Sequence, residues 1–255
     1  MRLALSSAAV RDASLRELLA GCVRRGLSGL ELVRTDGPGL HLAHGFSAAE
    51  ANSAATSVGL AVTGLYCPRL EPELLEDAAR LSGLANIPVV VPIGGLDRPV
   101  VPRAAELFQS AGGRLYLAHG SDARVVEAIR YLLTPLPHTE VIGLAWEIRP
   151  GVDEVAKLAD VIDAAGDALR YVRLHGGGPE SHAQSGMGIG AVMARLTLAR
   201  YEGPIVLTPS TPSYHYAWSA WLGRAGGWGC GSKQSDPGLT TLPASGVPTT
   251  TENLS

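Results

Sequence analysis

The sequence is poor in aromatic residues and in net charge, and both shortages exclude classes of partner. Only 5% of the residues are aromatic, and the formal net charge is -3 at pH 7. A chain without an excess of positive charge offers no broad basic surface to nucleic acid. No apolar run approaches the roughly 20 residues that a membrane-spanning helix needs. We therefore expect a small-molecule substrate, with neither a nucleic acid nor a membrane as partner.

Cysteine is scarce as well, and the number and spacing of the cysteines indicate the redox state of the compartment. The three cysteines, Cys22, Cys67 and Cys230, are odd in number and widely spaced. This pattern argues against a disulfide framework and favours a reducing, cytoplasmic location. Residues 1–10 lack the basic start and the long apolar core of a secretion signal, so we predict that they form a strand.

What the sequence does contain is a repeated pattern, a short apolar run followed by an amphipathic segment. The pattern occurs eight times, and its apolar runs open near Leu3, Gly29, Ala61, Pro88, Arg114, Val141, Leu169 and Ile205. Neighbouring parallel strands need a crossover, which a helix usually supplies. Eight such units predict an α/β fold, the (β/α)8 TIM barrel, over residues 1–225.

Residues 226–255 depart from this pattern. They are rich in Gly, Ser, Thr and Pro, a composition that buries too little apolar surface to fold alone. We predict a flexible C-terminal tail. Trp218, Trp221 and Trp228 stand where the barrel gives way to the tail. The sequence leaves open whether they pack in a last helix, cover the barrel or contact a second subunit of a homo-oligomer.

Local signals predict where several helices begin and end. Ser14 with Glu17, and Ser47 with Glu50, have the spacing of a capping box, in which each residue satisfies a backbone donor of the other. Glycines that follow the expected helices are predicted to end them in a left-handed conformation. These are Gly26, Gly59, Gly83, Gly112, Gly166 and Gly203.

Alternation along the strands predicts which side chains face the barrel axis. In the seventh run Val172 and Leu174 must face the helices, so Tyr171, Arg173 and His175 face inward. The same rule places Glu31, Glu147 and Thr208 inside, near strand ends where such barrels carry their active sites. Tyr116 and Tyr171 are expected to fill the barrel. The sequence therefore predicts that polar side chains line the end of the barrel at which the strands finish, which we call the mouth. Below the mouth, the interior of the barrel is predicted to be apolar.

The order of these segments, including Gly29-Leu30-Glu31-Leu32 after the first helix, resembles the xylose-isomerase-like TIM-barrel superfamily of sugar isomerases and epimerases. The likeness spans about residues 1–222. In the epimerase branch, it implies a divalent metal held at four strand ends, which here carry Ala118, Glu147, Arg173 and Thr208. Only Glu147 is a usual ligand, and an arginine stays protonated. We therefore expect no metal or other cofactor, with Arg173 in place of the cation. A shift of one residue in this assignment is the alternative, because it would bring His119 and His175 into the ligand places and restore a metal site.

Four residues are candidates for catalysis. Glu147 and His175 could exchange protons with a substrate while Arg173 stabilises a developing oxyanion. The alternative is a salt bridge among Glu147, Arg173 and Arg149 that stabilises the rim. His119 could act as a ligand, as a base or in hydroxyl recognition. It could equally be a loop histidine that caps the next helix.

Further residues are candidates for substrate binding. Glu31 could line the site or pair with Arg34. Thr208 and Tyr66 lie at other strand ends. The glycines Gly176, Gly177 and Gly178 follow the seventh strand, where the backbone of such barrels often binds phosphate, although triple glycine is also a common flexible loop.

The resemblance and these residues together imply an isomerase or epimerase. It would move a proton next to a carbonyl in a small polyhydroxylated or phosphorylated substrate without a metal. Two alternatives stay open. The barrel could carry a metal-free lyase, dehydratase or cyclase reaction of secondary metabolism, or it could be a non-catalytic binding barrel.

Overall fold

The computed structural model describes residues 2–10, 13–34, 42, 47–95, 98–133, 141–149, 157–176 and 189–209. Contacts divide the chain into two units, Met1–Arg224 and Ala225–Ser255, and every described residue belongs to the first. The predicted tail and the three tryptophans near it lie outside the described residues. The tail therefore stays a prediction.

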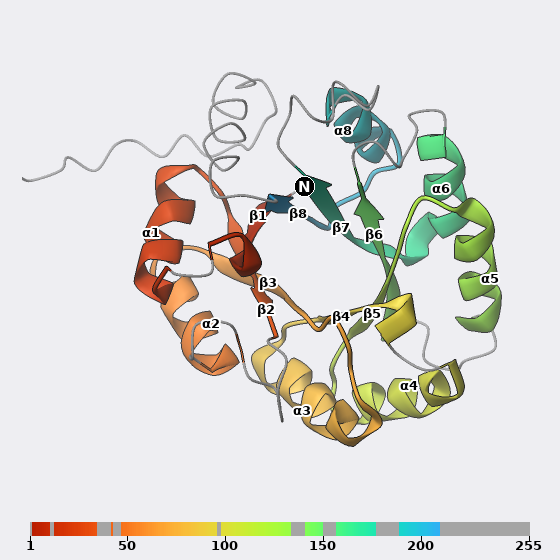
Figure 1. Cartoon of the computed structure of the whole chain (residues 1–255), viewed down its shortest axis with the longest axis horizontal. Coiled ribbons are helices and arrows are strands. Elements are labelled where there is room, and N and C mark those ends of the chain that lie inside the picture. Colours follow the sequence, from red (N-terminus) through yellow and green to blue (C-terminus); the bar gives the residue numbers. More distant parts are fainter. Residues whose placement is uncertain are drawn as a thin grey trace, which may run out of the picture. The chain divides into compact units, whose positions relative to one another are not determined.

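Eight parallel strands form a closed barrel (Figure 1). The strands are β1 (Arg2–Ser6), β2 (Gly29–Val33), β3 (Ala61–Tyr66), β4 (Val89–Pro92), β5 (Leu115–His119), β6 (Ile142–Ile148), β7 (Leu169–Gly176) and β8 (Pro204–Pro209). Each strand pairs with the next along the chain, and β8 pairs with β1. Every strand begins within one residue of the start predicted from the sequence, so the (β/α)8 prediction is confirmed.

Helices surround the barrel (Figure 1). They are α1 (Leu15–Arg24), α2 (Ala48–Ser57), α3 (Leu75–Ala85), α4 (Val101–Ser110), α5 (Ala123–Leu133), α6 (Lys157–Ala165) and α8 (Ile189–Leu198). A short 3-10 helix, η5 (Gly166–Ala168), links α6 to β7. Within the described part of the chain, no helix has the length and apolar character to cross a bilayer. Cys22 and Cys67 are buried free thiols.

Both predicted capping boxes are present. Ser14 accepts a hydrogen bond from the Glu17 backbone N–H at 3.3 Å, and the Ser14 N–H donates to the Glu17 carboxylate at 2.8 Å. Ser47 and Glu50 form the same pair at the start of α2, at 3.2 and 2.8 Å. These contacts satisfy backbone donors that a helix start leaves without partners.

Two of the predicted helix ends are wrong. Positive φ angles confirm the left-handed conformation at Gly26, Gly59, Gly112 and Gly166. Gly83 instead lies inside α3, and the left-handed residue that caps this helix is Asn86, with φ 53°. A Cβ at Gly83 would lie 1.9 Å from the Ala111 carbonyl oxygen, so this glycine permits close helix packing. Near the end of α8 the left-handed residue is Arg200, with φ 54°, and not Gly203.

The barrel interior forms its own apolar cluster beneath the mouth. Its buried members are Ala4, Val90, Tyr116, Ala118, Ala145, Tyr171 and Val206. The Tyr116 and Tyr171 rings have centroids 6.2 Å apart, which confirms that they fill the barrel. Gly64 provides room for Tyr171, because a Cβ there would lie 2.7 Å from the tyrosine hydroxyl. This apolar cluster fills the barrel interior below the polar residues of the mouth and holds them in place.

Candidate active site

The guanidinium of Arg173, on β7, stands at the centre of the mouth and is only 3% exposed. Its Nε donates to Glu31 Oε1 at 3.0 Å, and Nη2 donates to Oε2 at 3.2 Å. Its Nη1 donates to Glu147 Oε1. Burial works against the charge, yet the two carboxylates raise the pKa of Arg173 above its usual value. The site is therefore built around a permanent buried cation.

Tyr66 and Tyr171 complete the surroundings of this cation. The Arg173 guanidinium carbon lies 3.5 Å from the centroid of the Tyr66 ring, a cation–π contact. The Tyr171 hydroxyl donates to Glu31 Oε1 at 3.2 Å and lies 3.3 Å from the Thr63 hydroxyl. Glu31 is fully buried, so these bonds supply the partners its carboxylate needs.

The pairing of Glu31 with Arg34, one of the two readings of the sequence, is wrong. Arg34 pairs with Glu71 at 2.7 Å and donates to the Arg69 carbonyl at 2.6 Å. Glu31 points to the opposite side of β2, in register with Ser6 on β1. The structure therefore makes Glu31 part of the mouth.

Glu147, on β6, links Arg173 to the rim. Arg149 donates to Glu147 Oε2 at 3.1 Å, and His175 Nε2 lies 3.5 Å from Oε1. Burial raises the pKa of the Glu147 carboxyl, but His175 and the Arg173 charge outweigh burial and lower it to about 2. The carboxylate is ionised near neutral pH. The salt bridge among Glu147, Arg173 and Arg149, which the sequence offered as the alternative to a catalytic role, is present.

His175 stands at the edge of this cluster, 27% exposed along its side chain. Its Nε2 is buried and has no hydrogen-bond partner among the described residues. The imidazole lies between the Glu147 carboxylate and the partly exposed edge of the mouth. His175 is therefore placed to exchange protons between the cluster and a molecule in the mouth.

His119 does not join the other three candidate catalytic residues. On β5 it lies on the same face as Leu115 and Leu117, which pack in the cluster outside the barrel. Its Nδ1 donates to the Gly120 carbonyl at 2.7 Å, while its buried Nε2 has no partner within the described residues. Burial lowers its pKa. Its predicted role stays a prediction.

The candidate substrate-binding residues differ in whether their polar groups are free to bind a substrate. Thr208 donates its hydroxyl to the Leu174 carbonyl at 2.8 Å, which joins β8 to β7. Gly176 has φ 110°, a conformation that favours glycine. Gly177 and Gly178 lie outside the described residues, so their predicted role in anion binding remains open.

Two contributors were missed or undervalued by the sequence analysis. Tyr171 fills the barrel as expected, yet it also donates to Glu31. Ser6 is fully buried at the end of β1, and its hydroxyl has no partner among the described residues. The sequence places Ser6 at a strand end on the active face, but it assigns this residue no role. A buried hydroxyl that faces an active-site mouth needs a partner.

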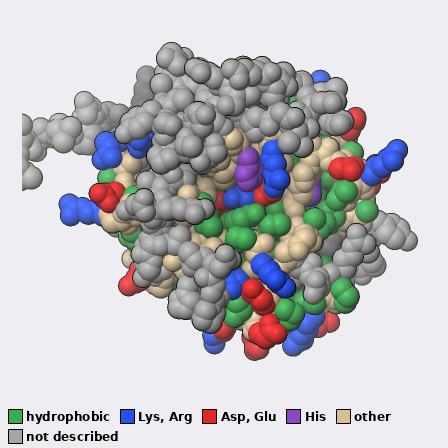
Figure 2. Space-filling model, in the orientation of Figure 1, with side chains coloured by type: hydrophobic (Ala, Val, Ile, Leu, Met, Phe, Trp, Pro, Cys, Tyr) green, Lys and Arg blue, Asp and Glu red, His purple; other side chains and the backbone are tan. Residues whose placement is uncertain are grey.

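In Figure 2, acidic, basic and histidine side chains gather near the centre of the barrel. Within the described ranges, no group of three His, Cys, Asp or Glu residues is placed to hold a metal ion. Of the four ligand places implied by the resemblance, only Glu147 holds a carboxylate, and it already pairs with two arginines. These residues do not fit a divalent cation.

Comparison with solved structures places this architecture among known barrels. D-psicose 3-epimerase from Clostridium cellulolyticum H10 matches with a TM-score of 0.60 and 12% identity, over 86% of this chain and 90% of that chain. L-ribulose 3-epimerase matches with a TM-score of 0.62 and 14% identity, over 92% and 89%. A xylose isomerase domain protein from Planctomyces limnophilus matches with a TM-score of 0.57 and 12% identity, over 88% and 93%.

These likenesses confirm the expected resemblance at the level of the fold. No protein-family profile matches the sequence, and no curated protein matches it either. A shared barrel fold supports many reactions, so the reaction has to be argued from the mouth itself.

Proposed function

We propose that this chain is an isomerase or epimerase that moves a proton next to a carbonyl in a small polyhydroxylated substrate without a metal. The observation that carries the proposal is the buried Arg173, held between Glu31 and Glu147 where the resemblance places a metal. The fold supports it, because similar structures are named as sugar 3-epimerases.

Arg173 supplies the positive charge in this proposal. Three of its five N–H donors bind the two carboxylates, which leaves one donor on Nη1 and one on Nη2. A fixed cation in a buried site stabilises negative charge that develops on a substrate oxygen. Because Glu31 and Glu147 fix the guanidinium, little reorganisation is needed when that charge forms.

His175 carries the proton. A carboxyl with a pKa of about 2 is a weak base near neutral pH, so Glu147 serves to orient and stabilise the imidazole. With Nε2 facing Glu147, Nδ1 of His175 is the nitrogen left for the substrate. Nδ1 takes the proton from the carbon beside the carbonyl, and the C–H electron pair forms an enediolate whose oxygen faces Arg173. Delivery of a proton from water to the opposite face of the same carbon inverts it and completes epimerisation. Delivery of the proton from His175 to the adjacent carbon, with the proton of the neighbouring hydroxyl passing to the former carbonyl oxygen, completes isomerisation.

Solvent exchange tests this proposal directly. The protein is incubated in D2O with D-fructose, D-tagatose, L-ribulose and their phosphate esters, and deuterium at carbon is followed by NMR. We expect exchange into at least one of these sugars. His175→Gln should slow it by about 100-fold or more, a typical effect of losing a general base. Glu147→Gln should slow it as well.

A matched control and the product analysis decide the outcome. Glu106→Gln removes an exposed carboxylate on α4 that pairs with Arg103, and it should leave exchange unchanged. Equal exchange in wild type and His175→Gln, or no exchange into any sugar by the folded wild type, would refute the proposal. A product that has lost water would assign the barrel to the dehydratases instead.

A further inference from the structure

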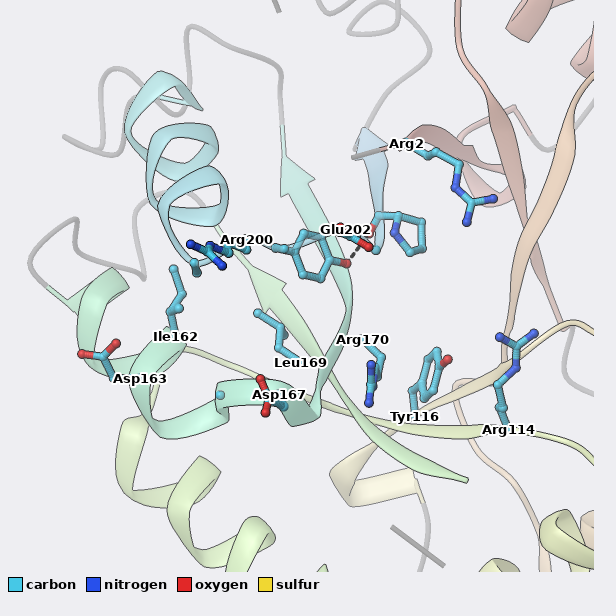
Figure 3. Close-up of a pocket in the computed structure, with 15 residues that line it drawn as sticks. Arg2, Arg114, Tyr116, Ile162, Asp163, Asp167, Leu169, Arg170, Arg200 and Glu202 are labelled. Carbon is cyan, nitrogen blue, oxygen red and sulfur yellow. Dashed lines mark hydrogen bonds between the residues drawn. The ribbon is translucent and has the colours of Figure 1, made fainter. Parts of the chain in front are cut away.

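A cavity lies at the opposite end of the barrel from the mouth. It has a volume of about 740 Å³ and lies among the starts of β1, β5, β7 and β8 and the ends of α6 and α8 (Figure 3). No step proposed for the mouth uses it. Its volume falls within the range of about 300–1,000 Å³ that is typical of small-molecule sites.

Four arginines line this cavity, and three of them lie at the starts of separate strands, whereas Arg200 follows α8. Arg2 begins β1, Arg114 directly precedes β5, and Arg170 lies at the start of β7. In the described part of the structure, Arg2 and Arg170 form neither an ion pair nor a side-chain hydrogen bond. Arg114 donates from Nη2 to the Asn86 carbonyl at 2.8 Å and to its side-chain oxygen at 2.7 Å. These bonds orient Arg114 and leave its Nε and Nη1 donors for another partner.

The wall of the cavity is shaped to hold one of these side chains. A Cβ at Gly143 would lie 2.6 Å from Arg170 Cγ and 2.8 Å from Tyr116 Cδ1. The glycine therefore lets the Arg170 stem and the Tyr116 ring lie against the backbone of β6. The stem of Arg170 is packed, whereas its charged end stays exposed and without a counter-charge among the described residues.

Carboxylates line the cavity as well, but they do not neutralise these arginines. Figure 3 shows Asp163 and Asp167 beside α6 and η5, away from Arg2 and Arg114. Glu202 lies on the segment before β8. Within the described residues, none of the three acidic side chains forms an ion pair with Arg2 or Arg170. The end of the cavity near β1 and β5 is therefore positive, and its guanidinium groups repel one another unless an anion lies between them.

We propose that this cavity binds a small phosphate-bearing anion through Arg2, Arg114 and Arg170. The planar guanidinium presents paired N–H donors that match phosphate oxygens. The bottom face of such a barrel usually serves stability. Exposed arginines without protein partners add little stability, so anion recognition would account for their convergence on one cavity. This inference does not depend on the reaction at the mouth.

Calorimetric titration of the full chain with inorganic pyrophosphate at low ionic strength tests this site. We expect one molecule to bind, and Arg170→Gln and Arg2→Gln each to weaken binding by about tenfold, as loss of one charge-assisted pair does. Arg16→Gln is the matched control. It removes the same charge from the first turn of α1, at the mouth end of the barrel, and should leave binding unchanged.

Two further comparisons make the result decisive. Arg149→Gln removes a cation of the mouth and should also leave pyrophosphate binding unchanged. Thermal unfolding confirms the fold of each variant, and the exposed Arg2 gives a second test if Arg170→Gln does not fold. The proposal is overturned if wild type binds no pyrophosphate, or if Arg16→Gln or Arg149→Gln weakens binding as much as the cavity variants.

Discussion

Single residues at the mouth are tied together by buried charge. Arg173 is 3% exposed and Glu31 is fully buried, so each needs the other. Removing one member of a buried ion pair leaves an uncompensated charge, which typically destabilises a protein by about 3–5 kcal/mol. The cluster therefore contributes to folding as well as to the proposed chemistry.

Glu31→Gln should thus lower the free energy of unfolding by about 3–5 kcal/mol in urea titrations. Asp77→Asn provides the control. It breaks an exposed pair with Arg80 on α3, and such pairs contribute about 1 kcal/mol or less. Equal losses in the two variants would show that Arg173 does not depend on Glu31.

The low pKa of Glu147 predicts a pH effect on stability. Its ordinary value of 4.5 falls to about 2 in the folded chain, so between these values the unfolded chain binds a proton that the folded chain does not. The stabilisation is complete above about pH 4.5 and is lost as pH falls toward 2. The difference in unfolding free energy between wild type and Glu147→Gln should shrink over this interval. A constant difference would contradict the lowered pKa.

The sequence could place residues on a face but could not choose their partners. Alternation correctly put Glu31, Glu147 and Arg173 inside the barrel, because aliphatic neighbours must face the helices. The partner of Glu31 was left open between the mouth and Arg34, since only the closed barrel brings β2 and β7 within reach. His119 lies at the end of β5 and has the same parity as Leu117. The alternation rule therefore already placed its side chain toward the helices and not toward the barrel axis.

At the scale of elements, the barrel interior needs a small residue on one strand wherever a large side chain from another strand packs against it. Gly64 on β3 faces Tyr171 on β7, and a Cβ there would lie 2.7 Å from the tyrosine hydroxyl. Tyr171 in turn donates to Glu31, so packing in one strand sets the position of a carboxylate in another.

Gly64→Ala should therefore destabilise the protein by about 1–3 kcal/mol, the usual effect of overpacking a core. Gly94→Ala is the control, because nothing lies within 4 Å of a Cβ built at that position. Chemical denaturation of the two variants gives the comparison. A Gly64→Ala variant as stable as Gly94→Ala would show that Tyr171 can move without loss.

Strand positions were easier to predict than helix ends. A strand start is marked by its own apolar run, whereas a helix end depends on the packing of the next turn. Gly83 was expected to end α3, but its lack of a side chain serves the approach of Ala111. Asn86 ends the helix instead, because asparagine tolerates the left-handed conformation better than most residues.

At the scale of the whole barrel, the two ends carry different electrostatics. The mouth pairs its cations with buried carboxylates, whereas the cavity at the other end leaves Arg2 and Arg170 without described counter-charges. The sequence did not predict this cavity. Arg2, Arg114 and Arg170 are far apart along the chain and read as ordinary strand-start residues until the barrel closes.

Metal dependence concerns the entire mouth, since a cation would need donors from several strands and Arg173 already occupies the centre. The most direct measurement is the rate of solvent deuterium exchange into the ketose panel by chelator-treated protein, with and without added Mn²⁺, alongside elemental analysis. We expect the chelated protein to retain its full rate and Mn²⁺ to add nothing. A stoichiometric bound metal whose removal abolishes exchange and whose return restores it would contradict the assignment of Arg173 as the charge at the centre of the site.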